Sequence, residues 1–291
     1  MNDVKRIYDH NFGNYSFTSK IFHGATKPLS TNDPLQEDVW SALVICAARL
    51  GAMTPNVLLD VGINRDSIVE IFRNSINLHR SLPSALLNSL LDACVDVEKT
   101  FNKSDKPVAK WVERLTQTPR AGATCPGKPR IVLEPPEMHS DHCVMVATYG
   151  YILADAFGAN RQDVWLIGLC HHLHNAYLPD AGFTGEILLG NHLGNIIQQQ
   201  RLRVLNTFTP FYKKKIHYLF EEVNDIESAL FKAFTAADTI DRIVQMEYYE
   251  RSACFKAINA LSDFNLVHEG AAQDFQHVLL DSIGIQYKKS A

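Results

Sequence analysis

The stretch RQDVWLIGLCHHLH, residues 161–174, holds the pattern that decides the fold. Its middle, VWLIGLC, would be apolar on every side of a helix, and a helix that is apolar all round lies in the centre of a domain. Asn160 just before it, with Asp163 at the third helical position, provides a capping signal for the start of that helix. We therefore expect a central helix that delivers His171 and His172 from the core outward at its C-terminal end.

Helical periodicity continues on both sides of this segment, and the alternation typical of strands is almost absent. The pattern predicts an all-α fold whose first helix starts at Asn32 or Asp33, with Pro34 behind the cap. The predicted helices cover residues 35–52, 65–77, 84–100, 107–115, 137–157, 161–175, 185–206, 211–222, 226–250, 253–261 and 270–282.

One long interruption divides the helical pattern. Residues 116–136 contain several prolines and glycines, and loops of this length are usually functional segments or linkers. We therefore predict three parts, which are an N-terminal helical region over 1–120, a linker or loop over 121–136, and a helical domain over 137–291.

The bulk composition excludes several classes of protein. The 291 residues carry a formal net charge of −4, which gives no reason to expect a nucleic acid polymer as partner. No apolar stretch reaches the roughly 18 to 20 residues that span a bilayer, and no signal-peptide core follows the first residues. The six cysteines show no metal-knuckle or redox spacing and are typical of a reducing compartment. We expect a cytoplasmic protein that does not bind membranes, and the sequence leaves a homo-oligomer open.

Histidines are concentrated in one part of the chain, because seven of the twelve lie between His139 and His217. A single histidine on an apolar helix face is more often a hydrogen-bonded core residue than a metal ligand. The number of histidines is therefore weaker evidence than the order of the motifs that contain them.

Among the carboxylates, Asp238 has the sequence context that most clearly requires a cationic partner or a metal. It shares one helical stripe with Phe231 and Phe234, since offsets of four and seven residues face the same way. A carboxylate on an apolar stripe costs several kcal/mol unless it is paired or binds a cation. The alternative to a metal is an ion pair with Arg242, one turn later. Asp241 is an alternative ligand, or a hydrogen-bond partner for the ring of a ligating histidine.

Three short motifs occur in order on three predicted helices, namely DHCVMVA at 141–147, GLCHH at 168–172 and AAD at 236–238. Together they resemble the HD-domain metal-dependent phosphohydrolase superfamily over about residues 139–245. The resemblance implies an HD-domain-like helical bundle preceded by an N-terminal helical layer. It also implies that His142, His171 and Asp238 bind a divalent transition metal such as iron, zinc, manganese or nickel.

The sequence departs from the family at one ligand. His172 stands where the family has the Asp of its His-Asp pair, and a neutral imidazole cannot bridge two metals as a carboxylate does. We expect His172 to be a further ligand of a centre that is mononuclear or has one strong and one weak position. His192 and His217 lie in the interval where the family branches with two metals have additional histidine ligands, so they are candidate ligands too.

The leading functional hypothesis is hydrolysis of a small phosphorylated substrate, with a nucleotide as the first candidate, by a metal-activated water. In this hypothesis Asp180 accepts a proton from the water and Asn175 positions it, while Tyr177 and Arg242 contact the substrate. Further basic side chains that could meet phosphates are Arg201, Arg203, Lys213, Lys214 and Lys215.

Two alternatives belong to other classes. An iron-dependent oxygenase of the HD type would be favoured if His192 and His217 both point at the metal. A catalytically degenerate binding or regulatory protein would explain the loss of the family's aspartate at His172, and the N-terminal helices would then provide its partner surface.

Overall fold

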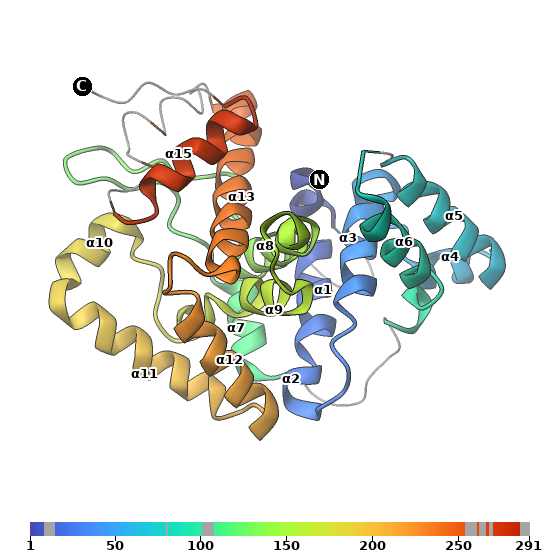
Figure 1. Cartoon of the computed structure of the whole chain (residues 1–291), viewed down its shortest axis with the longest axis horizontal. Coiled ribbons are helices and arrows are strands. Elements are labelled where there is room, and N and C mark those ends of the chain that lie inside the picture. Colours follow the sequence, from blue (N-terminus) through green and yellow to red (C-terminus); the bar gives the residue numbers. More distant parts are fainter. Residues whose placement is uncertain are drawn as a thin grey trace.

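The computed structural model describes residues 1–8, 15–79, 81–100, 108–253, 261, 266–267 and 270–285 (Figure 1). Within these residues the regular structure is helical, and the β-type pairings amount to isolated bridges such as the one between Ala123 and Ile131. The predicted all-α class is therefore confirmed. In the described part of the chain, no helix combines the length and the apolar character needed to cross a membrane.

The first half of the chain forms short helices. They are η1 (Asn2–Arg6), α1 (Phe17–Thr26), α2 (Pro28–Thr31), α3 (Glu37–Leu50), α4 (Pro55–Asp60), α5 (Arg65–Asn77), α6 (Ser84–Ala93), η3 (Val97–Lys99) and α7 (Lys110–Gln117), where η marks a 3-10 helix.

The second half contains the longer helices. They are α8 (His139–Leu153), η4 (Ala154–Phe157), α9 (Arg161–Cys170), η5 (Leu173–Ala176), α10 (Gly182–Leu189), η6 (Gly190–His192), α11 (Leu193–Leu205), α12 (Pro210–Glu222), α13 (Ala229–Ala253) and α15 (Gln273–Ser282).

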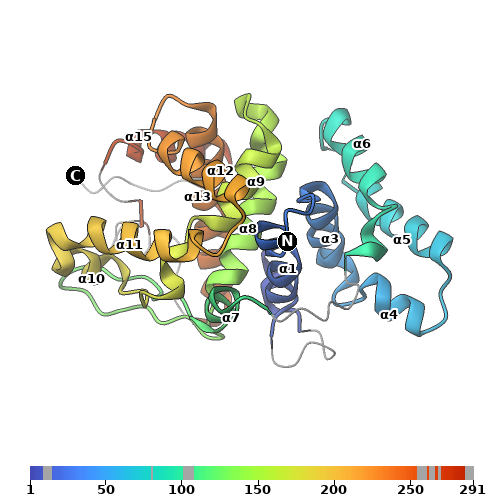
Figure 2. The ribbon, with the colours of Figure 1, turned by 90° about the horizontal axis from the view of Figure 1, so that it is seen from below.

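Helices α8 and α9 lie at the centre of the molecule, with α3 to α6 on one side and α10 to α12 on the other (Figures 1 and 2). Helix α8 packs against α9, α13, α1, α3 and α7. A Cβ atom built on Gly168 of α9 would lie 2.7 Å from Ala147 Cα of α8, so only glycine permits this approach of the two helices. The same contact brings the start of α8 close to the end of α9, where the histidines are.

The N-terminal helices share one buried apolar cluster with the second half of the chain. Trp111 of α7 contacts Phe22 of α1 edge-on and also lies 5.4 Å from Phe208, measured between ring centroids. The layer before residue 120 thus packs directly on the helices that carry the motifs. The three-part division at 121–136 stays a prediction.

Several helix boundaries differ from the predicted ones. Helix α3 begins after Gln36, because Asn32 adopts a left-handed conformation and ends α2. The sequence pattern had not indicated α1, α2 or α4. The predicted helix 185–206 is divided at Gly190, whose φ of +50° interrupts a right-handed helix. Most of the predicted helix 253–261 lies outside the described residues.

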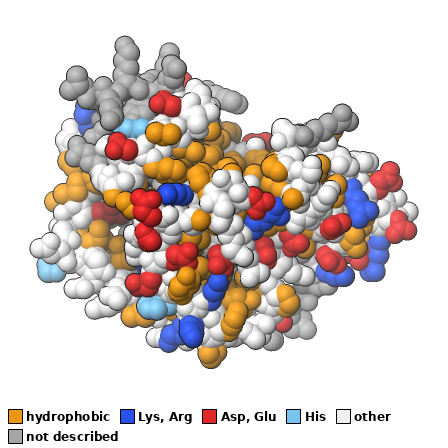
Figure 3. All heavy atoms as spheres, in the orientation of Figure 1, with side chains coloured by type: hydrophobic (Ala, Val, Ile, Leu, Met, Phe, Trp, Pro, Cys, Tyr) orange, Lys and Arg blue, Asp and Glu red, His pale blue; other side chains and the backbone are white. Residues whose placement is uncertain are grey.

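The capping signal at the start of α9 is confirmed, since Asn160 Oδ1 accepts a hydrogen bond from the Asp163 backbone at 3.1 Å. Helix α9 ends at Cys170, earlier than predicted, and η5 follows it. Figure 3 shows the surface hollowed between the α10–α11 arm and the body of the molecule. The described cysteines are free thiols, and Cys254 lies outside the described residues.

Candidate metal centre

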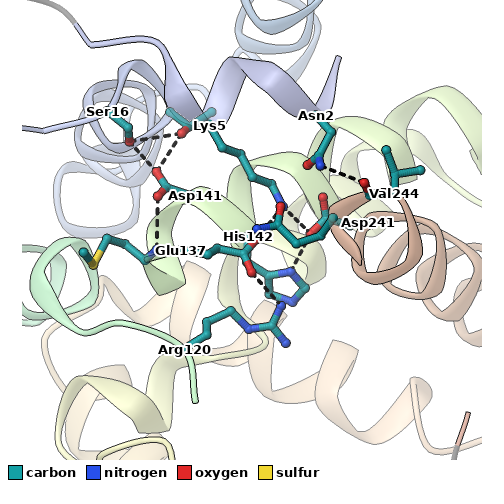
Figure 4. Close-up of polar contacts among 12 residues, drawn as sticks. Asn2, Lys5, Ser16, Arg120, Glu137, Asp141, His142, Asp241 and Val244 are labelled. Carbon is teal, nitrogen blue, oxygen red and sulfur yellow. Dashed lines mark hydrogen bonds and ion pairs between the residues drawn. The ribbon is translucent and has the colours of Figure 1, made fainter. Parts of the chain in front are cut away.

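His142 lies in the first turn of α8, and its side chain is fully buried. Its Nδ1 is 2.7 Å from Oδ2 of Asp241, which comes from α13 (Figure 4). A carboxylate oxygen accepts hydrogen bonds, so this contact keeps the ring proton on Nδ1. The Nε2 atom of His142 therefore presents a lone pair on the other side of the ring.

His171 follows the last residue of α9 and is held in the same way. Its Nδ1 donates to the Gly168 carbonyl at 2.7 Å, which leaves a lone pair on Nε2. The Nε2 atoms of His171 and His142 are 3.1 Å apart. Two nitrogens bound to one ion at about 2.0–2.1 Å each would be about 3 to 3.4 Å apart. The spacing thus fits two ligands of one metal.

His172 completes a cluster of three imidazoles. Its Nδ1 is 2.8 Å from Oδ1 of Asn175, and Nδ2 of the same amide donates to the Leu178 carbonyl at 3.1 Å. The second contact fixes the orientation of the amide, so His172 Nδ1 must be the donor in the first. One ring nitrogen each of His142, His171 and His172 lies within 4.8 Å of the other two. A group of this kind can hold a metal ion.

Asp238 of α13 adds a carboxylate to this side of His142. Its Oδ1 lies 3.2 Å from His142 Nε2, and its Oδ2 lies 3.2 Å from Arg242 Nε. Burial opposes ionisation of Asp238, but the charge of Arg242 holds its pKa well below the ordinary value. A metal and an ion pair with Arg242 were expected as alternatives for Asp238. In the structure, one oxygen of Asp238 faces the histidine cluster and the other pairs with Arg242.

The protonation state of the histidines suits a metal ligand. Burial lowers the pKa of both His171 and His172 well below the ordinary value, and the neighbouring histidines lower it further. The neutral imidazole is the form with a lone pair for a metal. At neutral pH both rings are thus in the binding form.

A buried group of charges supports the other side of His142. Lys5 Nζ lies 2.7 Å from Asp241 Oδ2 and also donates to Glu137 Oε1, while Arg120 Nη1 donates to Glu137 Oε2 at 3.3 Å. Asp241 was expected to be a metal ligand or a hydrogen-bond partner for a histidine ring, and it makes the hydrogen bond to His142 Nδ1. The sequence did not predict a role for Lys5, Glu137 or Arg120, because no local pattern connects these residues to the three motifs.

The two expected catalytic residues, Asn175 and Asp180, both make hydrogen bonds within the chain. Asn175 is buried and uses both ends of its amide, on His172 and on Leu178, so it orients His172 where the sequence analysis expected it to position water. Asp180 accepts hydrogen bonds from the backbone of Ala121 and Gly182, each at 2.9 Å. Burial opposes its ionisation, yet these two bonds and nearby Arg120 lower its pKa.

The two expected substrate-binding residues are also engaged. Both faces of the Tyr177 ring are approached by guanidinium groups, with Arg203 at 3.7 Å and Arg114 at 4.5 Å from the ring centroid. These cation–π contacts occupy the ring that was expected to pack against substrate. Arg242 lies beside the cluster through its ion pair with Asp238.

The structure does not bring the remaining candidate ligands to the cluster. His192 in η6 and His217 in α12 are both exposed, and neither belongs to a group of potential metal ligands among the described residues. Lys213 donates to Asn206, and Lys215 pairs with Asp163. His139, one turn before His142, is buried with its ring 5.0 Å from that of His172.

The cluster is thus assembled by α8, α9, η5 and α13, the elements that contain the three sequence motifs and the residues directly after them. A cluster of His and Asp side chains that can hold a metal does not by itself identify a family. No family model, no curated protein and no solved structure matches this chain.

Proposed function

We propose that the chain binds one divalent transition metal through His142, His171, His172 and Asp238, and that it hydrolyses a small phosphorylated molecule there. The convergence of three imidazoles carries the proposal, because each has an acceptor against its Nδ1 and its Nε2 left for a metal. Nitrogen-rich sets of this kind suit zinc, iron, nickel or copper better than magnesium. The phosphate ester comes from the resemblance to the HD superfamily, with a nucleotide as the first candidate.

A metal bound there would lower the pKa of a water and polarise the phosphoryl group. The chain's own residues would do the rest. Asp241, Gly168 and Asn175 hold the three rings in place, and Asp238 contributes the negative charge. Asp180 remains the proposed proton acceptor, since it is ionised and its Oδ2 lies 3.6 Å from Nε2 of the buried His139.

A partly buried guanidinium supports an anionic substrate. Arg201 of α11 stacks on Phe220 at 4.2 Å, and its Nε atom is buried without a hydrogen-bond partner. A buried nitrogen of a charged group is costly to leave without an acceptor. Arg201 lies near the cluster, because α11 packs on η5, the 3-10 helix that directly follows His172. It is thus a candidate contact for a phosphate.

The proposal is tested by metal analysis and a substrate panel on the same preparation. Freshly purified protein should contain about one transition metal per chain, and His171→Ala should lose it while it keeps the helical circular dichroism spectrum. His174→Ala, in the adjacent 3-10 helix, is the matched control and should retain the metal. Reconstituted protein is then assayed on nucleoside monophosphates, sugar phosphates and a model phosphodiester with zinc, manganese, iron and nickel.

Metal-dependent hydrolysis that disappears in His171→Ala supports the proposal, and a rise in KM in Arg201→Gln supports the assigned phosphate contact. Metal binding without hydrolysis of any phosphoester would contradict the proposed reaction. Protein that binds no metal would leave the binding or regulatory hypothesis. The oxygenase hypothesis lacks its supporting feature, because His192 and His217 are exposed.

A further inference from the structure

A second group of potential ligands lies on the Nδ1 side of His142. Ligand atoms of Glu137, His142 and Asp241 lie within 4.8 Å of one another, and all three residues are buried. The ammonium of Lys5 lies among the oxygens of this group, 2.7 Å from Asp241 Oδ2, 3.3 Å from Gln245 Oε1 and hydrogen-bonded to Glu137 Oε1 (Figure 4). A cation therefore already sits in this second group, and it belongs to the chain itself.

Lys5 is held there by the packing of η1. This 3-10 helix packs on α13, α3 and α1, and Asn2 Nδ2 donates to the Val244 carbonyl of α13 at 3.0 Å. The guanidinium of Arg6 stacks over the Tyr248 ring of α13 at 4.3 Å. Contacts on both sides of Lys5 thus fix the direction in which its side chain enters the core, where 1% of it remains exposed.

The charges in this region balance only with Lys5 included. Glu137 and Asp241 are buried carboxylates, with 2% and 0% of their side chains exposed. Burial opposes ionisation of Glu137, but the charges of Lys5 and then Arg120 hold its pKa well below the ordinary value. Arg120 contacts only the Glu137 carboxylate in this pair, so Lys5 is the cation that compensates Asp241. Without Lys5, one buried negative charge would lack a partner.

We propose that the oxygens of Glu137, Asp241 and Gln245 form a cation site that the chain fills with the ammonium of Lys5. The centre would then contain one exchangeable metal and one cation that is covalently part of the chain. The exchangeable metal rests on the proposed function, whereas the role of Lys5 does not depend on it. Lys5 acts as a positioning residue in this arrangement. Its ammonium, 2.7 Å from Asp241 Oδ2, holds this carboxylate in place as the acceptor of His142 Nδ1, and so keeps the lone pair of Nε2 directed at the metal side.

The chemistry of the site indicates what would replace Lys5. Carboxylate and amide oxygens are the ligands of hard cations such as Mg²⁺, Ca²⁺ and Mn²⁺. A cavity of about 240 Å³ lies beside the Lys5 side chain and is lined by Lys5, Ser16 and Asp141 among others. Removing the lysine side chain should therefore convert the position from a tethered cation to a site for an added metal.

The test counts Mn²⁺ ions that bind to zinc-loaded protein, from the electron paramagnetic resonance signal of free Mn²⁺. Wild-type protein should bind no Mn²⁺ tightly once zinc is loaded, and Lys5→Ala should bind one additional equivalent. Lys99→Ala is the matched control, because it also removes a lysine from a carboxylate, but Asp96 there is exposed and stays solvated. It should behave as wild type.

Three outcomes decide the inference. A Lys5→Ala protein that folds and binds no additional Mn²⁺ has taken up a proton or relaxed, and the inference is overturned. If Lys5→Ala fails to fold alone, recovery of cooperative unfolding with added Mn²⁺ supports the inference, and failure to recover overturns it. In Lys5→Ala/His171→Ala the Mn²⁺ equivalent should persist although zinc is lost, which separates this site from the proposed metal function.

Discussion

The two nitrogens of the His142 ring have opposite kinds of surroundings. On the Nδ1 side, Asp241 accepts the ring proton, and Lys5 lies between Asp241 and Glu137, so the chain balances its own charges. On the Nε2 side, His171 Nε2 at 3.1 Å and Asp238 Oδ1 at 3.2 Å both offer lone pairs. Atoms that only accept are brought together when a cation is to lie among them.

This difference separates stability from binding. On the Nδ1 side the charged groups are paired within the folded chain, so the loss of one of them should appear in the free energy of unfolding. The groups on the Nε2 side are fully compensated only when a metal is bound, so their loss should appear in the affinity for the metal.

The largest expected effect comes from exchanging each aspartate for asparagine. Asp241→Asn leaves the ammonium of Lys5 with one carboxylate fewer in a fully buried position, and should lower the free energy of unfolding by about 3 to 5 kcal/mol. Asp238→Asn breaks an ion pair with Arg242 in which the side chains are 21% and 19% exposed, and should cost less, about 1 to 3 kcal/mol, in metal-free protein. Urea denaturation of both variants, with and without zinc, measures the contrast.

Metal affinity should rank the same two variants differently. Asp238→Asn removes a proposed ligand, so it should reduce the affinity for zinc strongly although it destabilises the fold less than Asp241→Asn does. Equal losses of stability in the two metal-free variants would show that the two sides of His142 do not differ in the way described.

The sequence predicted one side of His142 better than the other. His142, His171 and Asp238 lie in motifs on predicted helices, and helical spacing plus a family resemblance were enough to connect them. Lys5 and Glu137 are 132 residues apart, and their contact depends on how η1 packs against α13. No periodicity or local motif encodes such a contact, so the supporting charges could not be predicted.

The helices show a similar limit. The all-α class and the capped start of α9 followed from periodicity and capping chemistry. The end of α9 at Cys170 and the division at Gly190 did not, because apolar periodicity continues through both positions while the backbone turns. The end of α9 matters for the site, since η5 after it carries Asn175, whose amide was expected to meet water and instead holds His172.

The next effect concerns that amide. Asn175→Ala removes the acceptor that fixes the proton on His172 Nδ1, and should weaken zinc binding about 10- to 100-fold, the range for lost partners of metal ligands. Asn175→Asp keeps the acceptor for His172 Nδ1, although it replaces the donor to Leu178 by an oxygen and adds a negative charge, so its zinc affinity should stay much closer to wild type. Competition with a chromophoric chelator gives both values. Equal weakening in the two variants would mean that the amide acts through packing and not through the tautomer of His172.

The smallest effect uses His139, which shares α8 with His142 but has no carboxylate against its donor nitrogen. Its Nδ1 donates to the Thr118 carbonyl at 2.9 Å, and its Nε2 is buried without a hydrogen-bond partner. Burial lowers the pKa of His139 to about 4, against which nearby Asp180 raises it only in part. A histidine with a lowered folded-state pKa stabilises the fold above its unfolded pKa near 6.5, and this stability is lost as the pH falls below that value. Between pH 7 and pH 5.5 the metal-free wild type should therefore lose about 1 kcal/mol more than His139→Gln in urea denaturation. If the two proteins lost the same amount of stability, His139 would be charged in the folded state. Asp180 would then be its carboxylate partner, as Asp241 is the carboxylate partner of His142.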